Sequence, residues 1–473
     1  MSPMEQSTRS DVPGVRWPSM ATEEDARRLA LQFQYAKTER WPESVLEAQQ
    51  FRQIEMLIAH CYQAAPYWRD RLRQAGLRPG QEINQTVWSR LPILTRAEAQ
   101  RVGEQLRSDG VPSWHGATYG SATSGSTGIP LQYTKTNLRA VYWFSFSLRI
   151  MLWHRVKLDE TMAVIKLMRS GEAWSDEGVW YQDWGDDYAP FKTGRAVHLD
   201  IRLPPADQIA WLIRENVGYI LTFPTNVAAL VRYCRAENIR LPNLRGIHIY
   251  GESIPDGLRQ LCRDIFQIEM VDSYSAEETG LMAMQCPEHA HHHVMSEGMK
   301  LEVLDEHDRP CGVGETGRVV VTPLHNLAMP LLRYEVGDFA EVGPACRCGR
   351  TLPVLSRILG RSRDRVHMPG GESRLAFWGS QQLYRLPAII LHQVAQVAQV
   401  AQVALDTMEY RLVARRPLTP DEEALLVTML RDSLGYPFRV RFMYLDAIPR
   451  SASGKYQDFR SEIGTNDPAG DTI

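Results

Sequence analysis

The sequence lacks the features that mark several classes of protein. Its 473 residues include only seven cysteines, too few for a disulfide framework in a chain of this length. It has no run of about eighteen apolar residues, the minimum for a membrane-spanning helix, and its first residues lack the apolar core of a secretory signal. The net charge of -3 shows no basic excess for nucleic acid or a membrane surface. We therefore expect a cytoplasmic protein that binds neither.

The remaining composition is that of an ordinary folded protein. Apolar residues make up 44% and charged residues 23% of the sequence, both usual for globular proteins. A chain of 473 residues exceeds one ordinary hydrophobic core, so two or three domains are expected. Cys61, Cys234 and Cys262 fall within apolar helical patterns, which predicts that they are plain core residues.

The apolar pattern changes along the chain. Residues 43–76 carry apolar side chains at three- and four-residue spacing, which predicts helix. From about Gly110 to Gly360, short apolar runs alternate with helical patterns, which predicts α/β layers with largely parallel strands. The predicted strands are 163–167, 219–222 and 246–250, and the predicted helices are 206–215 and 226–237.

A smaller unit is predicted after the basic and polar stretch 357–364, which precedes Pro369-Gly370-Gly371. Candidate strands lie at 410–414 and 440–445, and a candidate helix at 421–434. The expected fold is α/β, with a large multilayer domain over 23–360, a small mobile α+β domain over 361–463, and disordered tails at 1–22 and 464–473. The Gln-Val-Ala repeat at 393–404 is interpreted as an expanded strand without catalytic meaning.

The segment most suggestive of chemistry is Thr123-Ser124-Gly125-Ser126-Thr127-Gly128. Glycines let the backbone approach a ligand, and hydroxyls and backbone N–H groups donate to phosphate oxygens, so this composition suits a loop around a polyphosphate. It differs from the other common phosphate loop, because no Gly-Lys-Ser/Thr follows at the required spacing. A Ser/Gly-rich linker is the alternative.

Several downstream segments allow either a nucleotide role or a plainer one. Gly251-Glu252-Ser253 follows a predicted strand and either leaves room for a flat ring or forms a simple turn. Tyr274 and Glu278 suit base stacking and Mg²⁺ coordination, or else a helix start with acidic residues in its first turn. Asp338 follows a glycine and suits either the two ribose hydroxyls or a Gly-Asp turn.

Two basic segments lie near the C-terminus. Arg361 and Asp364 belong to a charged run at the predicted domain boundary, where arginine suits phosphate or ribose and a solvated linker is the alternative. Lys455 follows a glycine on a flexible stretch. A lysine on a mobile loop can reach a charged transition state and then leave, although most lysines are simply exposed.

A cysteine and histidine pattern suggests a metal site. Cys286 and the histidines within 289–293 precede Cys346 and Cys348 by about sixty residues. Three cysteines and one histidine can form a closed tetrahedral zinc site. Cys-x-Cys is tighter than the usual Cys-x₂-Cys spacing, and unpaired cysteines beside a solvated histidine run are the alternative.

Taken in order, these segments resemble the adenylate-forming superfamily of acyl-CoA synthetases, peptide-synthetase adenylation domains and firefly luciferase. The phosphate loop, Tyr-x-x-x-Glu, Tyr-x-x-Gly-Asp, Gly-Arg-x-x-Asp and Gly-Lys segments all match. Within it, the chain is most similar to the phenylacetate-CoA ligase and CapK-like branch. That resemblance begins at Leu57–Cys61, continues through Ala65–Trp68 and Leu91–Thr95, and extends to about Phe459.

The resemblance implies a role for each segment. Residues Thr123 to Gly128 would bind the β- and γ-phosphates of ATP, and Glu278 would hold Mg²⁺. Gly251, Glu252 and Ser253 would line the adenine, and Tyr274 would stack on it. Asp338 would hold the ribose, Arg361 would support ribose or phosphate, Asp364 would be the hinge, and Lys455 would bridge the carboxylate and the α-phosphate.

The same branch shows a Cys…His and Cys-x-Cys-Gly-Arg pair that binds a structural zinc in some members. By this resemblance His293 is the expected histidine, with His289 and His292 as alternatives. One departure concerns Ser275 and Glu277, which stand where the family usually has Gly and Thr or Ser. A second carboxylate there would repel the α-phosphate, so either Glu277 turns away or Thr279 supplies the missing hydroxyl.

The resemblance implies an ATP-dependent enzyme that converts a small carboxylic acid to an acyl-adenylate and passes the acyl group to CoA or a carrier-protein phosphopantetheine. Capture by an amine or hydroxyl, and a silent nucleotide-binding homologue, are the alternatives. An aromatic acid is expected. Residues 174–191 suit an acyl or acceptor pocket or an anchored surface loop, and residues 219–225 line the acyl pocket in relatives. The resemblance leaves open whether the chain forms a homodimer.

Overall fold

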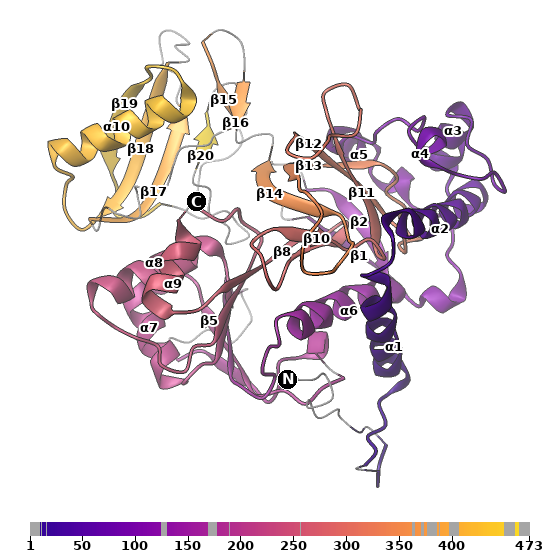
Figure 1. The fold of residues 1–473 in the computed structure, drawn as a ribbon, viewed down its shortest axis with the longest axis horizontal. Helices are drawn as coiled ribbons and strands as arrows, with labels where there is room; N and C mark the ends of the chain where they lie inside the picture. Colours follow the sequence, from indigo (N-terminus) through magenta and orange to yellow (C-terminus); the bar gives the residue numbers. More distant parts are fainter. Residues whose placement is uncertain are drawn as a thin grey trace.

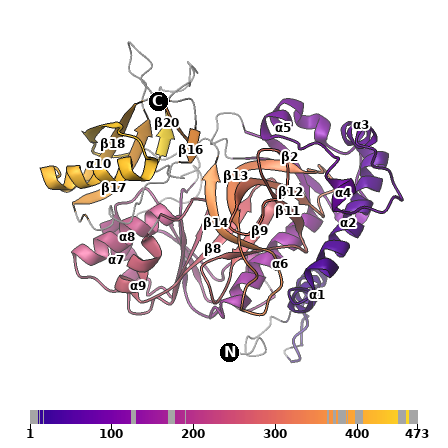
Figure 2. The ribbon, with the colours of Figure 1, turned by 45° about the horizontal axis from the view of Figure 1, so that its top comes forward.

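The computed structural model of this protein describes residues 10, 12–15, 17–123, 130–168, 177–188, 190–255, 257–361, 365–369, 373–375, 386, 388–396, 406–448 and 459–462. Figures 1 and 2 show N-terminal helices at one end, a large sheet in the centre and a small sheet with one helix at the other end. No helix among these residues is long and apolar enough to cross a membrane.

The N-terminal helices pack on the large sheet. They are α1 (Glu23–Thr38), α2 (Glu43–Ala64), α3 (Pro66–Gln74), α4 (Gln85–Trp88) and α5 (Arg96–Val102). The helix predicted over 43–76 is two helices, because Ala65 leaves helical geometry at φ -129° and Pro66 begins the next helix. Apolar positions of α2 such as Ile54 and Leu57 are fully buried in a core shared with the sheet.

Within the described residues, twelve strands form the large sheet in the order β11-β12-β13-β14-β10-β9-β8-β7-β6-β3-β5-β4. Strands β5, β3, β6, β7 and β8 pair in parallel, and the other neighbours are antiparallel. The bounds are β3 (Met162–Lys166), β4 (Val179–Tyr181), β5 (Ala196–Asp200), β6 (Tyr219–Thr222), β7 (Gly246–Tyr250), β8 (Met270–Ala276), β9 (Gly280–Gln285), β10 (His292–Val294), β11 (Met299–Leu304), β12 (Thr316–Pro323), β13 (Tyr334–Val342) and β14 (Val354–Arg361). The predicted α/β fold is confirmed, with a sheet that is mixed.

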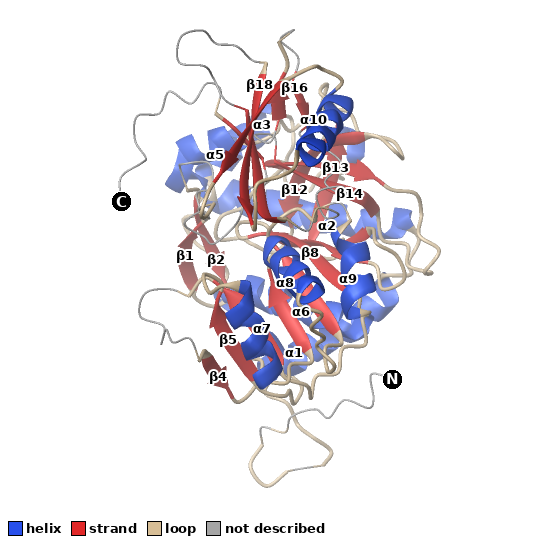
Figure 3. Cartoon of the chain, turned by 90° about the vertical axis from the view of Figure 1, so that its left-hand side faces the viewer, coloured by secondary structure: helices blue, strands red, loops and turns tan. Residues whose placement is uncertain are grey.

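Helices cover both faces of the parallel strands. Helices α7 (Pro205–Arg214), α8 (Pro224–Ala236) and α9 (Leu258–Phe266) connect these strands and lie on one face (Figure 3). Helix α6 (Asn137–Trp153) packs on the other face. The alternation of strand side chains separates the two cores: Ala163 and Ile165 belong to the first, and Met162 to the second. The predicted strands at 219–222 and 246–250 coincide with β6 and β7.

The antiparallel part of the sheet is strongly curved. Strands β14, β10 and β9 separate β13 from β8, so a flat sheet would hold β13 and β8 about 19 Å apart. Instead, Tyr274 on β8 and Asp338 on β13 form a hydrogen bond of 2.8 Å. Irregular register between β12 and β13 and between β13 and β14 marks bulges, which bend strands and increase their twist. The curvature gathers distant segments into one site.

Shorter elements complete the chain. The hairpin of β1 (Thr118–Ala122) and β2 (Gln132–Thr136) flanks the predicted phosphate loop. The small unit has the sheet order β19-β18-β17-β20. Its bounds are β17 (Ile389–Gln396), β18 (Thr407–Ala414), α10 (Pro420–Leu434), β19 (Arg439–Tyr444) and β20 (Phe459–Ser461), preceded by the hairpin of β15 (Arg365–His367) and β16 (Ser373–Leu375). The short 3₁₀ helices are η2 (Gly103–Leu106), η3 (Ser113–His115) and η4 (Asp186–Tyr188).

The small unit follows the sequence prediction closely. Strand β18 covers the predicted strand at 410–414, β19 covers all but the last residue of the predicted strand at 440–445, and α10 covers the predicted helix at 421–434. Helix α10 begins with a capping box between Thr419 and Glu422. The first residues of the Gln-Val-Ala repeat lie in β17, and 397–404 lie outside the described residues. The domain boundary near residue 361 and the two disordered tails remain predictions.

Candidate active site and metal centre

The phosphate-loop prediction falls mostly on residues 124–129, which lie outside the described part of the chain. Thr123 is described and buried. Its backbone N–H donates to the Leu131 carbonyl at 3.0 Å, and its Oγ1 accepts from the Leu131 N–H at 2.9 Å. These two bonds close the base of the loop between β1 and β2. Thr123 Oγ1 also accepts a 3.2 Å bond from Arg96 Nη2.

Glu278 lies in the turn between β8 and β9 with only 3% of its surface exposed. The alternative of a helix start here is therefore wrong, because the chain passes from strand to strand. Glu278 Oε1 accepts from Arg96 Nη1 at 2.7 Å and from the Tyr334 hydroxyl at 3.1 Å. Burial opposes the charge of Arg96, but Tyr334 and Glu278 outweigh it and hold its pKa above the ordinary value. Arg96 thus joins the predicted magnesium carboxylate to the base of the phosphate loop.

Sequence reasoning did not assign Arg96 or Tyr334 to the site. Both lie in or beside segments that carry the family resemblance: Arg96 directly follows the Leu91–Thr95 segment, and Tyr334 begins the Tyr-x-x-Gly-Asp segment. Their meeting depends on a backbone bridge: the Leu94 N–H donates to the Arg333 carbonyl, and the Glu335 N–H donates to the Leu94 carbonyl, both at 2.9 Å. This bridge places the start of α5 beside β13.

Tyr274 and Asp338, predicted to contact the adenine and the ribose, are direct partners. The Tyr274 hydroxyl donates to Asp338 Oδ2 at 2.8 Å, and both side chains are largely buried. Asp338 follows Gly337, whose φ of +92° suits glycine best. Arg361 lies opposite Asp338 across β13 and β14 by backbone pairing. The arrangement brings three predicted nucleotide residues into one neighbourhood.

The Gly251-Glu252-Ser253 segment follows β7 and turns with a φ of +76° at Gly251. Glu252 Oε2 accepts from the Thr225 backbone N–H at 3.1 Å and from the Thr225 hydroxyl at 2.7 Å. Thr225 lies in the first turn of α8, a helix whose N-cap residue makes no side-chain cap. Glu252 therefore caps α8 from a distant loop, which fixes the predicted adenine segment against that helix.

The unusual Glu277 is directed toward the β1–β2 hairpin. Its Oε2 accepts from the Tyr133 hydroxyl at 3.1 Å, and its carbonyl accepts from Arg139 Nη2 at 2.6 Å. Glu277 and Glu278 thus bind different partners on different elements. The Thr279 hydroxyl is buried without a hydrogen-bond partner among the described residues. Of the two sequence alternatives, the first agrees with this placement, since Glu277 turns away from Glu278.

For three predicted site residues the structure describes no side chain. Lys455 and Asp364 lie outside the described residues, and of Arg361 only the backbone is described.

In the aromatic segment 174–191, Trp184, Tyr188 and Phe191 are buried in a core cluster with α6. These three rings therefore act as core anchors, which favours the anchored-loop interpretation of that segment over an open pocket.

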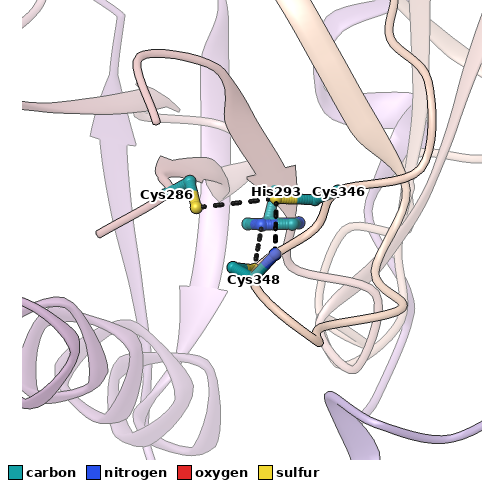
Figure 4. A group of neighbouring side chains, drawn as sticks. All are labelled: Cys286, His293, Cys346 and Cys348. Atoms are coloured by element: carbon teal, nitrogen blue, oxygen red, sulfur yellow. Dashed lines mark hydrogen bonds between the residues drawn. The ribbon is translucent and has the colours of Figure 1, made fainter. Parts of the chain in front are cut away.

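The predicted metal residues meet at one point (Figure 4). Ligand atoms of Cys286, His293, Cys346 and Cys348 all lie within 4.8 Å of one another. The Cys286 and Cys346 sulfurs are 3.8 Å apart, and the Cys348 sulfur is 3.4 Å from His293 Nε2. Zinc with bonds of about 2.3 Å in a tetrahedron places two sulfurs about 3.8 Å apart. The spacing therefore fits zinc.

The surroundings of His293 and Cys348 also suit a metal, whereas burial raises the pKa of the Cys286 and Cys346 thiols. Burial lowers the pKa of His293 to about 4, so its ring is neutral at neutral pH. Nδ1 of that ring lies 3.3 Å from the Leu352 carbonyl, which fixes its proton there and leaves Nε2 as a ligand. Burial opposes ionisation of the Cys348 thiol, but hydrogen bonds from the Arg350 backbone and neighbouring thiols hold its pKa below the ordinary value.

The other histidines of the run lie outside this group. His292 Nε2 is 2.8 Å from a carboxylate oxygen of Asp272, and His289 is exposed. The tertiary structure thus selects His293, which the sequence resemblance favoured. Cys61, Cys234 and Cys262 are buried apolar residues, as predicted.

No family model matches the sequence. The phenylacetate-coenzyme A ligase of Thermus thermophilus is 23% identical over an alignment of 461 residues, and the match covers 88% of this chain and 96% of that protein. Two crystal structures of 2-hydroxyisobutyryl-CoA ligase are each 17% identical, covering 90% of this chain and 92% of theirs. The TM-score is 0.70 for the postadenylation state with an acyl-AMP and 0.57 for the thioesterification state with CoA. The likeness to these structures extends over most of the chain.

Proposed function

We propose that this chain, a member of the adenylate-forming superfamily in its phenylacetate-CoA ligase-like branch, is an ATP-dependent carboxylic acid–CoA ligase. The observation that supports this most is the convergence on Arg96, which bonds both Thr123 at the base of the phosphate loop and Glu278. Motif residues about 155 positions apart in sequence are thereby held in one buried site.

The first half-reaction would be attack of a substrate carboxylate oxygen on the α-phosphorus of ATP, with pyrophosphate leaving. Residues 123–128 would donate to the β- and γ-phosphates, and Glu278 would hold Mg²⁺, which neutralises phosphate charge. Asp338 would accept the ribose hydroxyls, and Arg361 would support ribose or phosphate. Tyr274 would stack on the adenine, lined by residues 251–253. Lys455 would stabilise the charge that develops between the carboxylate and the α-phosphate.

The second half-reaction would be attack of a thiol sulfur on the acyl carbonyl carbon, with AMP leaving and a thioester forming. CoA is the proposed thiol, because the related ligases named above act on CoA. The small unit would turn about Asp364 between the two steps and withdraw Lys455. A carrier-protein phosphopantetheine is the second candidate for the thiol.

An aromatic acid is the proposed substrate, supported by the full-length similarity to a phenylacetate-coenzyme A ligase. The structural likeness to a 2-hydroxyisobutyryl-CoA ligase makes a small branched hydroxy acid the second candidate. A panel that contains both classes of acid would separate them, since one pocket rarely accepts a flat ring and a compact branched group equally well.

We further propose that Cys286, His293, Cys346 and Cys348 hold one zinc ion. Four protein ligands leave no open coordination position, so the ion would stabilise structure and supply no catalytic water.

The experiment that tests the function is carboxylate-dependent exchange of labelled pyrophosphate into ATP, followed by product analysis with CoA or a phosphopantetheinylated carrier protein. Exchange with an aromatic acid, then acyl-CoA formation, is expected. Exchange without any thioester, but with an amide or ester on addition of an amine or alcohol, would favour the other ligase class. Absence of exchange with every acid tested would identify a silent homologue and overturn the proposal.

A further inference from the structure

The turn after α1 is bound by the segment that follows Cys348. The Thr351 backbone N–H donates to the Glu39 carbonyl at 2.8 Å, and Arg40 Nη1 donates to the Gly349 carbonyl at 3.2 Å. The Thr351 hydroxyl also donates to the carbonyls of Glu39, at 3.3 Å, and Trp41. Residues 39–41 and 349–351 thus form a continuous contact between parts of the chain about 310 residues apart.

Glu39 is the centre of this contact and is buried. Its carboxylate lies 3.3 Å from Arg350 Nε and accepts 3.2 Å and 2.9 Å bonds from Arg149 and Trp153 of α6. A buried carboxylate needs such partners, because its charge is costly to remove from water. Arg350, beside the cysteine pair, contributes one of them.

The same side chains reach the cysteine and histidine group. The Trp153 ring lies edge-on to the His293 ring with centroids 5.9 Å apart, and the Arg350 guanidinium lies 4.4 Å from the Trp153 ring centroid. The Leu352 carbonyl faces His293 Nδ1 at 3.3 Å. One short stretch, 346–352, therefore contacts the proposed metal group on one side and the end of α1 on the other.

Residues 343–353 contain no helix or strand. Without a ladder of backbone hydrogen bonds, such a segment takes its shape from a few side-chain anchors, and two of them are the sulfurs of Cys346 and Cys348. A metal that binds both sulfurs to Cys286 and His293 would fix their positions against β9 and β10.

We propose that the metal centre anchors the N-terminal helix: metal bound at Cys286, His293, Cys346 and Cys348 holds residues 349–351 in the conformation that binds Glu39, so loss of the metal releases the end of α1. This inference rests on the proposed zinc site. It predicts that release is local, because the parallel strands and helices α7–α9 share a core that contains no residue of α1 or of the 346–352 segment.

Hydrogen exchange of the full chain, paired with elemental analysis, tests the proposal. Removal of zinc from folded wild-type protein by a chelator, and separately Cys348→Ser, should speed exchange in residues 35–42 at least about tenfold while β6 and β7 stay protected. Glu39→Gln should speed exchange at the same residues yet keep one zinc per chain. The matched control is Glu47→Gln on α2, which removes a half-exposed carboxylate that pairs with Lys300 on β11. It should change neither the exchange rate of residues 35–42 nor the zinc content.

Each other outcome counts against the proposal. Unchanged exchange at 35–42 after zinc removal overturns it, and so does equal acceleration over the whole chain. Absence of zinc in wild-type protein prepared without chelator would refute the metal assignment itself, which elemental analysis distinguishes from failure of the anchor alone.

Discussion

The Tyr274 hydroxyl on β8 donates a 2.8 Å hydrogen bond to Asp338 on β13, although three strands separate these two in the sheet. The two residues proposed to contact the adenine and the ribose therefore hold each other in place. A substitution at Tyr274 should therefore weaken binding of the ribose as well as of the adenine.

Tyr274→Phe should raise the KM for ATP about tenfold with a smaller change in kcat. The phenyl ring can still stack, but Asp338 loses a donor, and a hydrogen bond to a charged group contributes about 1.5–3 kcal/mol. Steady-state kinetics of pyrophosphate exchange measures both constants. Tyr444→Phe, which removes an exposed hydroxyl that bonds Glu423 in the small unit, is the control. An unaltered KM for ATP in Tyr274→Phe would contradict the assignment.

Arg96→Gln should both destabilise the large domain and suppress adenylate formation. It leaves the buried Glu278 without its cation, and breaking a buried ion pair from one side costs about 3–5 kcal/mol. Arg101→Gln on the same helix is the control, since Arg101 is 74% exposed and its 4.0 Å pair with Glu98 should contribute at most about 1 kcal/mol. Denaturant unfolding compares the free energies of unfolding of the two variants. An equal loss of stability in both would show that the Arg96–Glu278 pair contributes no more than the exposed pair.

Lys455→Ala should abolish adenylate formation and spare thioester formation from acyl-AMP prepared in advance. A charge contact made mainly in the transition state is worth about 10²–10³ in rate. Pyrophosphate exchange follows the first step, and thioester formation from added acyl-AMP follows the second. The role of Lys455 would be refuted by a mutant whose exchange rate equals that of the wild type.

Asp364→Pro should slow thioester formation steeply and leave adenylate formation largely intact. Proline fixes φ near -65° and removes an N–H, so a backbone hinge at this position would be restricted to one arrangement. The two half-reactions are measured separately, as for Lys455→Ala. Equal slowing of both steps, or of neither, would argue against a hinge at Asp364.

Protein purified without a histidine tag or chelator should contain about one zinc per chain. Cys348→Ser should remove that zinc and lower the thermal midpoint more than it lowers the specific activity of the folded fraction, because the site is closed and Cys286 lies at the opposite end of β9 from Glu278. Cys311→Ser, at a half-buried cysteine outside the metal group, should retain the zinc. Metal-free wild-type protein, or zinc retained in Cys348→Ser, would reject the assignment.

The sequence by itself determined the local elements and the identity of most candidate residues. Strands β6 and β7 were predicted at their observed bounds, and α10 within one residue, because apolar spacing and flanking turn residues act over a few positions. The order of the motif segments was likewise visible without any structure. The break at Pro66 was missed because the apolar spacing continues across it, while the proline starts a new helix.

Only the tertiary structure decided which of these residues touch. Arg96 and Glu278 are 182 positions apart, and no local pattern reports a contact across that distance. The curvature of the antiparallel strands brings Tyr334 to Glu278 and Asp338 to Tyr274. Strand pairing also chose His293 over His292, because neighbours in a strand point to opposite faces, and only His293 faces the cysteines. The sequence determines which side chains are present, and the curvature of the sheet determines the distances between them.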